Sequence, residues 1–267
     1  MDFKVVRNDI TDMEVDTIVL PANTRLRVGR GASMAIFNKA GQNELEKACR
    51  QIYEDYQGRH VELEPGMTVA TPAFALPSKV ILHTIVPRWR DGAHGEYGQL
   101  SKAYLSALSL ADSMGFKSIA FPLLASGNNG FDTDVAIEVA VASIKAYQQT
   151  DRLSEVFIVV FEASAAKKMR DLGYDVQEYI DQLYVLEQGF AQGAERDSRI
   201  EHRKKKKVDK GSLDRALRKA KKWVSDPKNQ KILNDLAHQA IKLVYENTKE
   251  EQPQIALLLK PFIQEEE

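Results

Sequence analysis

The sequence is poor in the residues that build disulfide frameworks and common metal sites. Its 267 residues include one cysteine, Cys49, so no intramolecular disulfide can form. The five histidines show no HExxH or similar ligand spacing. Without a pair of cysteines, a structural zinc site is not expected either. We therefore expect neither a metal nor an organic cofactor.

Long apolar runs are also absent. Nowhere do about 18 apolar residues follow one another, and the opening MDFKVVRND lacks the apolar core of a secretory signal. Hydrophobic residues make up 43% of the chain and charged residues 28%, as in ordinary globular proteins. These features predict a soluble cytoplasmic protein without a membrane partner.

The formal net charge is only −1, but the charges are unevenly distributed. From Arg196 to Lys222 there are thirteen Lys/Arg against four Asp/Glu, a net charge of +9, so the other residues carry −10. An unbroken lysine run at 204–207 lies in a stretch without apolar periodicity. This pattern predicts a basic linker over 190–211, attached to an acidic globule.

Short β-branched runs alternate with helical patterns over the first 190 residues. Strands are predicted at 3–7, 17–20, 68–72, 80–85, 118–123 and 156–161, and several are nearly continuous apolar runs, typical of strands covered on both faces. Helices are predicted between them at 33–39, 43–56, 99–113, 133–147 and 163–172. The alternation predicts a three-layer α/β/α fold around a mixed, mostly parallel sheet, with the ligand beyond the carboxyl ends of the strands.

A short helical C-terminal extension is predicted over 212–267. Leu213, Leu217, Ala220 and Val224 fall on one helix face. The dipeptide at 226–227 is Asp-Pro, typical of an N-cap followed by proline in the first helical position. A last apolar run occupies 255–259. The sequence leaves open whether these helices pack together, on the globule or on a partner.

Two glycine-bearing loops each follow a predicted strand and precede a predicted helix. The first contains Gly29 and Gly31, and the second is the run SGNNGF at 126–131. Glycines let the backbone approach a ligand closely, and successive N–H groups at a helix N-terminus bind anions. Neither loop matches a P-loop or the full GxGxxG fingerprint, and either alone would more often be structural. Together at one sheet edge they predict a diphosphate clamp.

Four motifs, in this order and spacing, resemble those of the macrodomain, an ADP-ribose-binding module. They are NDIT at 8–11, LPAN at 20–23 with the loop that follows, HTIVPRW at 83–89, and FPLLASGNNGF at 121–131. The resemblance covers roughly residues 1–175. It implies that the predicted globule, 1–189, is a macrodomain.

The resemblance also implies a role for each motif. Asp9 would accept a hydrogen bond from the adenine amino group, while the N–H of Ile10 serves the ring. Asn23 would reach the distal ribose and act in catalysis. Without the resemblance, Asp9 is a turn or cap residue before Thr11, and Asn23 forms an Asx turn. The ribose and phosphates would lie along Gly29, Gly31, Ala32, Ser33, Ser126, Gly127, Asn128, Asn129, Gly130 and Phe131.

The sequence departs from the family pattern in three places. Hydrolytic macrodomains commonly carry an aspartate where this chain has Ser33, and Ser33 cannot act as a carboxylate base. Arg30 stands where that loop usually has glycine, and Asn129 where Tyr or Phe is frequent. These departures put aspartate-assisted hydrolysis in doubt.

Three functions therefore stay open. The first is a hydrolase that removes ADP-ribose from modified proteins or cleaves ADP-ribose esters. The second is a non-catalytic ADP-ribose reader. The third alternative is a protein that binds nucleic acid, another polyanion or a protein partner through the basic segment from Arg196 to Lys222. Among the remaining polar residues, we expect His83 to be a core histidine, His94 a solvated loop residue, and Asp91 and Asp132 turn and cap residues.

Overall fold

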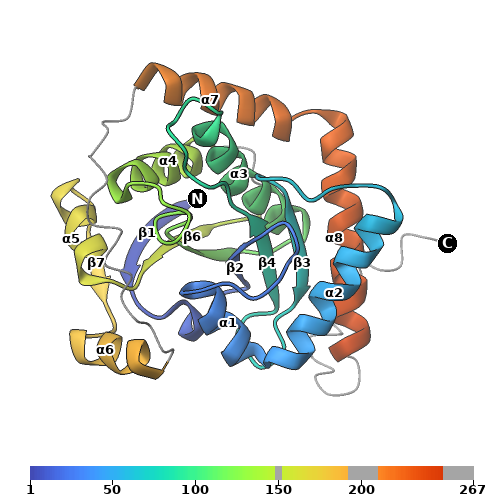
Figure 1. The fold of residues 1–267 in the computed structure, drawn as a ribbon, viewed down its shortest axis with the longest axis horizontal. Coiled ribbons are helices and arrows are strands. Elements are labelled where there is room, and N and C mark those ends of the chain that lie inside the picture. Colours follow the sequence, from blue (N-terminus) through green and yellow to red (C-terminus); the bar gives the residue numbers. More distant parts are fainter. Residues whose placement is uncertain (148–151, 192–209, 249–267) are drawn as a thin grey trace.

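The computed structural model describes residues 1–147, 152–191 and 210–248 (Figure 1). Seven strands form one sheet in the order β3-β4-β2-β5-β6-β1-β7. All neighbouring strands run parallel except β3 and β4. The strands are β1 (Asp2–Arg7), β2 (Thr17–Ala22), β3 (Thr68–Pro72), β4 (Val80–Ile85), β5 (Ser118–Pro122), β6 (Glu155–Val160) and β7 (Val176–Glu178).

Helices cover both faces of this sheet. Because side chains alternate along a strand, Val5 faces one apolar layer and Val6 the other. The first layer packs against α3, α4 and α5, and the second against α1 and α2 (Figure 1). The helices are the 3-10 turn η1 (Ile10–Asp12), α1 (Ala32–Ala40), α2 (Gln42–Gly58), α3 (Glu96–Ser113), α4 (Thr133–Ala146), α5 (Ala163–Asp171), α6 (Gln182–Ala191), α7 (Lys210–Val224) and α8 (Pro227–Thr248).

The predicted fold class is confirmed: the sheet is mixed and mostly parallel, and it lies between helices with a helical region at the C-terminal end. Two elements, β7 and α6, were not predicted from the sequence. With three residues, β7 is too short to show a period-2 pattern, and it forms by pairing with β1. Also, α8 is 22 residues long, whereas short helices were predicted.

The C-terminal helix α7 packs on the globule. Its Leu213, Ala216, Ala220 and Val224 are buried in the layer that contains α3. At its end, the Trp223 ring lies 3.9 Å from the Lys102 Nζ of α3, a cation–π contact. The predicted apolar face of this helix thus covers the outer side of α3.

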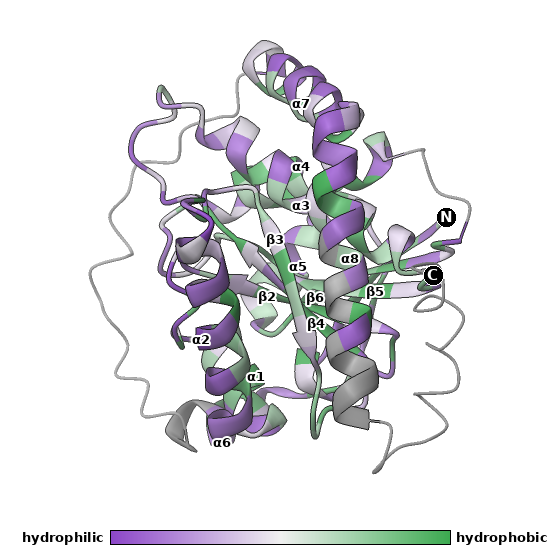
Figure 2. Ribbon diagram, turned by 90° about the vertical axis from the view of Figure 1, so that its right-hand side faces the viewer, coloured by the Kyte–Doolittle hydropathy of each residue, from purple (hydrophilic) through white to green (hydrophobic). Residues whose placement is uncertain are grey.

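Helix α8 continues along the edge of the sheet, beside β3 (Figure 2). Asp226 caps it, accepting a hydrogen bond from the Lys228 N–H at 2.9 Å, and Pro227 opens it as predicted. Leu233, Ala237 and Ile241 are buried. Since β3 is an edge strand, α8 covers an edge that would otherwise be open to pairing with another chain.

Most of the predicted linker and the apolar run at 255–259 lie outside the described residues, and the domain boundaries stay predictions. Among the described helices, none is both long and apolar enough to cross a bilayer.

Candidate functional site

The predicted site residues gather at one edge of the sheet. Asp9 follows β1, Asn23 follows β2 and the SGNNGF loop follows β5, and these strands are parallel, so their carboxyl ends meet at the same edge. The strand order puts β5 and β6 between β2 and β1. Asp9 and Asn23 therefore end strands three spacings apart, about 14 Å. A ligand with two ring systems joined by a diphosphate can span that distance.

Asp9 lies at the β1 end of this edge and is both a cap and a buried acceptor. Its Oδ1 accepts hydrogen bonds from the N–H and hydroxyl of Thr11, at 2.9 and 2.7 Å. The residue is only 6% exposed. Within the described part of the chain, the N–H of Ile10 donates to no protein group. The turn that Asp9 caps thus presents a carboxylate and a free N–H side by side.

Asn23, at the end of β2, organises the first loop. Its Oδ1 accepts from the N–H groups of Arg25 and Arg27, and its Nδ2 donates to the Arg27 carbonyl at 2.6 Å. This is the Asx-type turn considered above. The side chain is nevertheless exposed, so one amide both shapes the loop and faces the edge.

Ser33 ties the first loop to the start of α1. It is 3% exposed, and its Oγ accepts the Gly29 N–H at 3.0 Å. Gly31, with a φ of 61°, is the N-cap of α1 and supplies no side-chain cap. The N–H groups of the first turn of α1 are thus left for an anion. Arg30, next to them, is exposed.

The second loop offers a row of N–H groups. Those of Ser126, Gly127, Asn128 and Asn129 donate to no group within the described residues. The loop is held from inside by the Ser126 hydroxyl, which donates to the Leu123 carbonyl, and by the Gly130 N–H, which donates to the Gly127 carbonyl. Successive free N–H groups form an anion-binding concavity.

Phe131 closes the second loop from beneath. It is 3% exposed, and its ring packs edge-on against Trp89, with the centroids 5.0 Å apart. The Trp89 N–H donates to the Asn129 carbonyl at 2.8 Å, which fastens this loop to the one that follows β4. The structure thus places Phe131 under the loop, as a support for its backbone.

Two aromatic residues at the Asp9 end were missed by the sequence analysis. Phe161 directly follows β6, and Tyr184 lies on α6, with the ring centroids 6.4 Å apart. The Tyr184 hydroxyl lies 3.3 Å from Asp9 Oδ2 and from Asp12 Oδ2. Phe161 was detectable as the last residue of an apolar run, but nothing local in the sequence connects residue 184 with residue 9.

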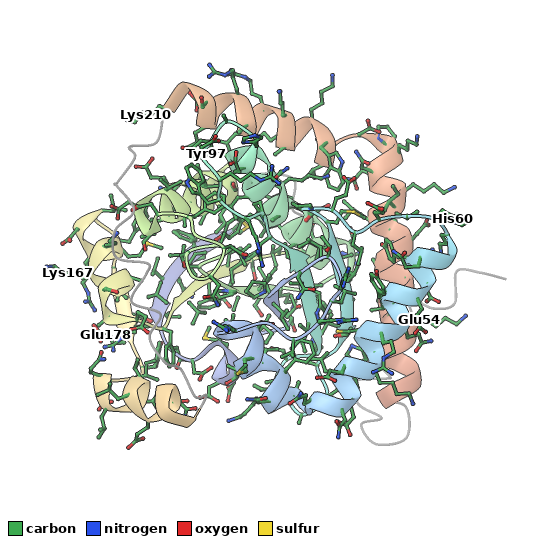
Figure 3. The ribbon with its side chains drawn as sticks, viewed as in Figure 1. Glu54, His60, Tyr97, Lys167, Glu178 and Lys210 are labelled. Atoms are coloured by element: carbon green, nitrogen blue, oxygen red, sulfur yellow. The ribbon has the colours of Figure 1, made fainter. Side chains whose placement is uncertain are left out.

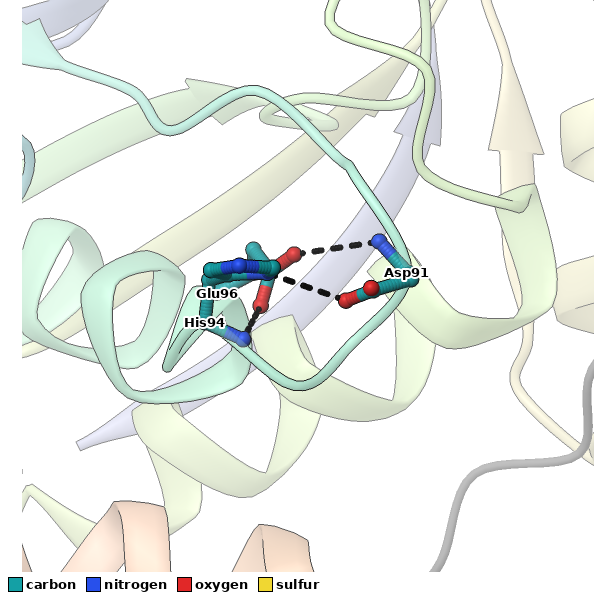
Figure 4. A group of neighbouring side chains, drawn as sticks. All are labelled: Asp91, His94 and Glu96. Carbon is teal, nitrogen blue, oxygen red and sulfur yellow. Dashed lines mark hydrogen bonds and ion pairs between the residues drawn. The ribbon is translucent and has the colours of Figure 1, made fainter.

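A cluster of Asp91, His94 and Glu96 follows β4 (Figure 4). The Glu96 carboxylate accepts the N–H groups of Arg90, Asp91, Gly92 and His94. Burial raises the pKa of Glu96, but these hydrogen bonds outweigh it and hold the pKa below its ordinary value. Its lone pairs are thus committed to folding the loop. As expected, Asp91 is a turn residue, since its Oδ1 accepts the Ala93 N–H.

His83 and Asp132 also have the expected structural roles. His83 is fully buried, with Nε2 2.8 Å from the Thr71 hydroxyl, and burial lowers its pKa to about 3. Asp132 caps α4, accepting the Asp134 N–H at 2.9 Å. Cys49 is buried as well, and burial raises the pKa of its thiol to about 12, so it is unreactive.

Comparisons with known proteins show which family this chain is similar to. A family model of the macro domain matches residues 19–140, which include both glycine loops. An O-acetyl-ADP-ribose deacetylase of Escherichia fergusonii is 40% identical over 159 residues, 59% of this chain and 87% of that protein. A mutant Oceanobacillus iheyensis macrodomain with ADPR is similar at a TM-score of 0.58 and 31% identity, covering 63% of this chain and 91% of that one. A Trypanosoma brucei macrodomain in complex with ADP-ribose gives 0.55 and 26%, covering 64% and 68%.

Proposed function

This chain belongs to the macrodomain family, and from that premise we propose that it binds ADP-ribose and hydrolyses an ester bond on the distal ribose. The observation that carries the proposal is the edge itself, where free N–H groups of the second loop and of the first turn of α1 share one end of the sheet with Asp9 and Asn23. The E. fergusonii deacetylase supports ester cleavage as the reaction.

Each part of the edge matches one part of the ligand. The Asp9 carboxylate and the Ile10 N–H form an acceptor and donor pair for an aminopurine edge. The N–H groups of residues 126–129 and of the first turn of α1 face the diphosphate, and they carry no charge of their own to be desolvated. The Asn23 amide lies next to the distal ribose.

In the reaction, a water molecule adds to the acyl carbonyl, the ester C–O bond breaks, and the ribose hydroxyl leaves with a proton. Ser33 cannot take the proton of the water, because it is not a carboxylate and its Oγ already accepts the Gly29 N–H. A phosphate oxygen of the substrate takes that proton instead. Asn23 and the first loop orient the water, which contributes to the rate through positioning.

The test uses the full chain with O-acetyl-ADP-ribose and with a protein that carries ADP-ribose on an acidic side chain. Release of acetate from the first substrate, or of ADP-ribose from the second, supports hydrolysis and tells the two linkages apart. Calorimetry with ADP-ribose and AMP measures binding separately. Binding without release identifies a reader, and no heat at high ligand concentration rejects the assignment.

A second function is favoured by the outer face of α7. Six cations are exposed on this helix against one carboxylate, that of Asp214. Within the described residues, Arg218, Lys219 and Lys222 form no ion pair. We propose that this face binds a nucleic acid and brings the macrodomain to its substrate.

A matched pair of variants tests the nucleic-acid proposal. In the full chain, Arg218, Lys219 and Lys222 are changed to Glu. The control changes three exposed cations elsewhere to Glu, namely Lys47, Arg50 and Lys167 (Lys167 is labelled in Figure 3). Binding to duplex DNA and RNA is titrated against salt. The α7 variant should lose affinity and flatten the logarithmic salt slope by about 0.9 for each lost phosphate contact. Equal losses in both variants would indicate that only net charge matters.

A further inference from the structure

Helix α6 is fastened over the Asp9 end of the site. The Arg7 guanidinium, at the end of β1, donates to Glu178 Oε2 at 2.8 Å and to Gln182 Oε1 at 3.2 Å (Glu178 is labelled in Figure 3). Asp181 caps the helix by accepting the Tyr184 N–H at 2.9 Å. The start of α6, and with it Tyr184, is thereby held close to the carboxyl end of β1.

The Tyr184 hydroxyl is shared between two carboxylates. It lies 3.3 Å from Asp9 Oδ2 and 3.3 Å from Asp12 Oδ2, long distances for hydroxyl donors. One hydroxyl has one proton, so neither carboxylate receives a full hydrogen bond. Burial raises the pKa of Tyr184, and so do the charges of Asp9 and Asp12. The phenol therefore stays protonated and donates at neutral pH.

Asp9 has only one oxygen left for a ligand. Its Oδ1 already accepts two hydrogen bonds from Thr11, which fills its two lone pairs. The other oxygen, Oδ2, faces Tyr184. An exocyclic amine that bonds to Asp9 must therefore use the oxygen that the phenol now occupies.

The space beside this contact suits a planar base. A cavity of about 680 Å³ opens between the ends of β1 and β7 and the start of α6, and its lining includes Asn8, Asp12, Asp181 and Tyr184. Phe161 adds an aromatic face next to Tyr184. The carboxylates of this lining favour a base with an exocyclic amine donor, and the aromatic rings favour a planar one.

We propose that Tyr184 is a gate at the base end of the site: its hydroxyl occupies the free oxygen of Asp9, and only a base with an exocyclic amine replaces it. This inference rests on the proposed ADP-ribose binding and adds its selectivity and its moving part. The bond given up is long and shared, so a ligand can displace it, at a cost of no more than one net hydrogen bond. In the same orientation, hypoxanthine would place its carbonyl against Asp9 Oδ2 and its N1–H against the Ile10 N–H. Its donor and acceptor are thus reversed, and it cannot displace the phenol there.

The test is calorimetry on the full chain with ADP-ribose and with its hypoxanthine counterpart, inosine diphosphate ribose. Tyr184→Phe removes the competing hydroxyl and keeps the ring. ADP-ribose should bind about 3- to 10-fold more tightly to this variant, the equivalent of one net hydrogen bond, while the affinity for the hypoxanthine ligand stays unchanged. The control is Tyr174→Phe, which removes a hydroxyl that accepts a hydrogen bond from Lys145 Nζ. The Tyr174 ring packs on Phe3, near the other end of β1.

Each remaining outcome decides against the gate. Unchanged or weaker ADP-ribose binding in Tyr184→Phe means that the phenol does not compete. An equal gain for both ligands means that the substitution merely opens the cavity. If the wild type binds ADP-ribose and Tyr184→Phe gives one of these two results, the gate alone is rejected. If neither the wild type nor the variants bind ADP-ribose, the proposed function is rejected as well.

Discussion

At the scale of single residues, several side chains at the carboxyl edge of the sheet have both a structural role and a proposed binding role. Asp9 caps a turn and offers an acceptor, and Asn23 shapes a loop while its side chain stays exposed at the same edge of the sheet. Ser33 is the most informative case, because a buried hydroxyl stands where the resemblance to hydrolytic macrodomains leads us to expect a carboxylate. Its contact with Gly29 keeps the loop in place.

The two functions of that position can be separated by two substitutions. Ser33→Ala removes the acceptor of the Gly29 N–H, and ADP-ribose affinity should fall about 2- to 10-fold, the usual range for one hydrogen bond. Ser33→Asp keeps an acceptor and adds a base, so ester hydrolysis should become faster. Calorimetry and acetate release measure the two effects. Ser164→Ala, at an exposed position on α5, should change neither, and an unaltered rate in Ser33→Asp would mean that the water is activated by another route.

The burial of His83 lets us predict how the free energy of unfolding depends on pH. Burial lowers its pKa to about 3 from an ordinary value of 6.5. Above pH 6.5 the histidine is neutral in both states, and its contribution is complete. As the pH falls from 6.5 towards 3, only the unfolded chain takes up the proton, so the free energy of unfolding should drop by about 1.4 kcal/mol per pH unit.

Denaturant unfolding at pH 7, 5.5 and 4.5 checks this slope. His83→Gln should show a shallower decline than wild type, while His238→Gln, at an exposed position on α8, should keep the wild-type slope. Identical slopes in all three proteins would mean that carboxylates alone set the acid sensitivity.

At the scale of elements, the contact between α3 and α7 depends on small residues. A methyl group on Gly98 would lie 3.7 Å from the Cβ of Ala216, so these two helices approach closely at this point. The Glu96–Gly98 turn also follows the loop in which Trp89 bonds to Asn129. A change in the packing of α7 on α3 can therefore shift the second glycine loop.

Ala216→Leu should destabilise the protein by about 1–3 kcal/mol, because extra methyl groups must fit into a filled helix interface. Lys219→Leu, on the exposed face of the same helix, should leave the free energy of unfolding within about 0.5 kcal/mol of wild type. Urea unfolding of the two variants provides the comparison. A similar result for both would show that α7 is not packed as described.

At the scale of the whole molecule, α7 and α8 form part of the fold. Together they bury Leu213, Val224, Leu233 and Ile241 against α3 and the edge strand β3. A buried Leu, Ile or Val contributes about 1.5–3 kcal/mol. Their removal would also uncover an edge strand, which favours association between chains.

The fragment 1–209 should therefore unfold at a lower temperature than the full chain and associate at high concentration. The fragment 1–248, which keeps both helices, should unfold at a higher temperature than 1–209 and stay monomeric at the same concentration. Thermal unfolding and size-exclusion chromatography measure the two effects. A stable, monomeric 1–209 fragment would mean that α7 and α8 contribute little to the stability of the globule.

The sequence by itself determined the fold class and the two glycine loops, because these follow from local patterns. Alternating apolar runs and helical periods predicted six of the strands and the helices between them. The turns at Asp9 and Asn23 follow from side chains that bond to their own neighbours in sequence. Local chemistry of this kind needs no partner from elsewhere in the chain.

Only the tertiary structure decided which distant groups meet. A three-residue strand such as β7 exists because β1 offers it hydrogen bonds, and Tyr184 meets Asp9 because Arg7 holds the start of α6 near the end of β1. Likewise, the sequence predicted the apolar face of α7 but not the surface on which it packs, because many surfaces could bury the same side chains. Contacts between residues far apart in sequence depend on how whole elements pack, and no local pattern encodes that.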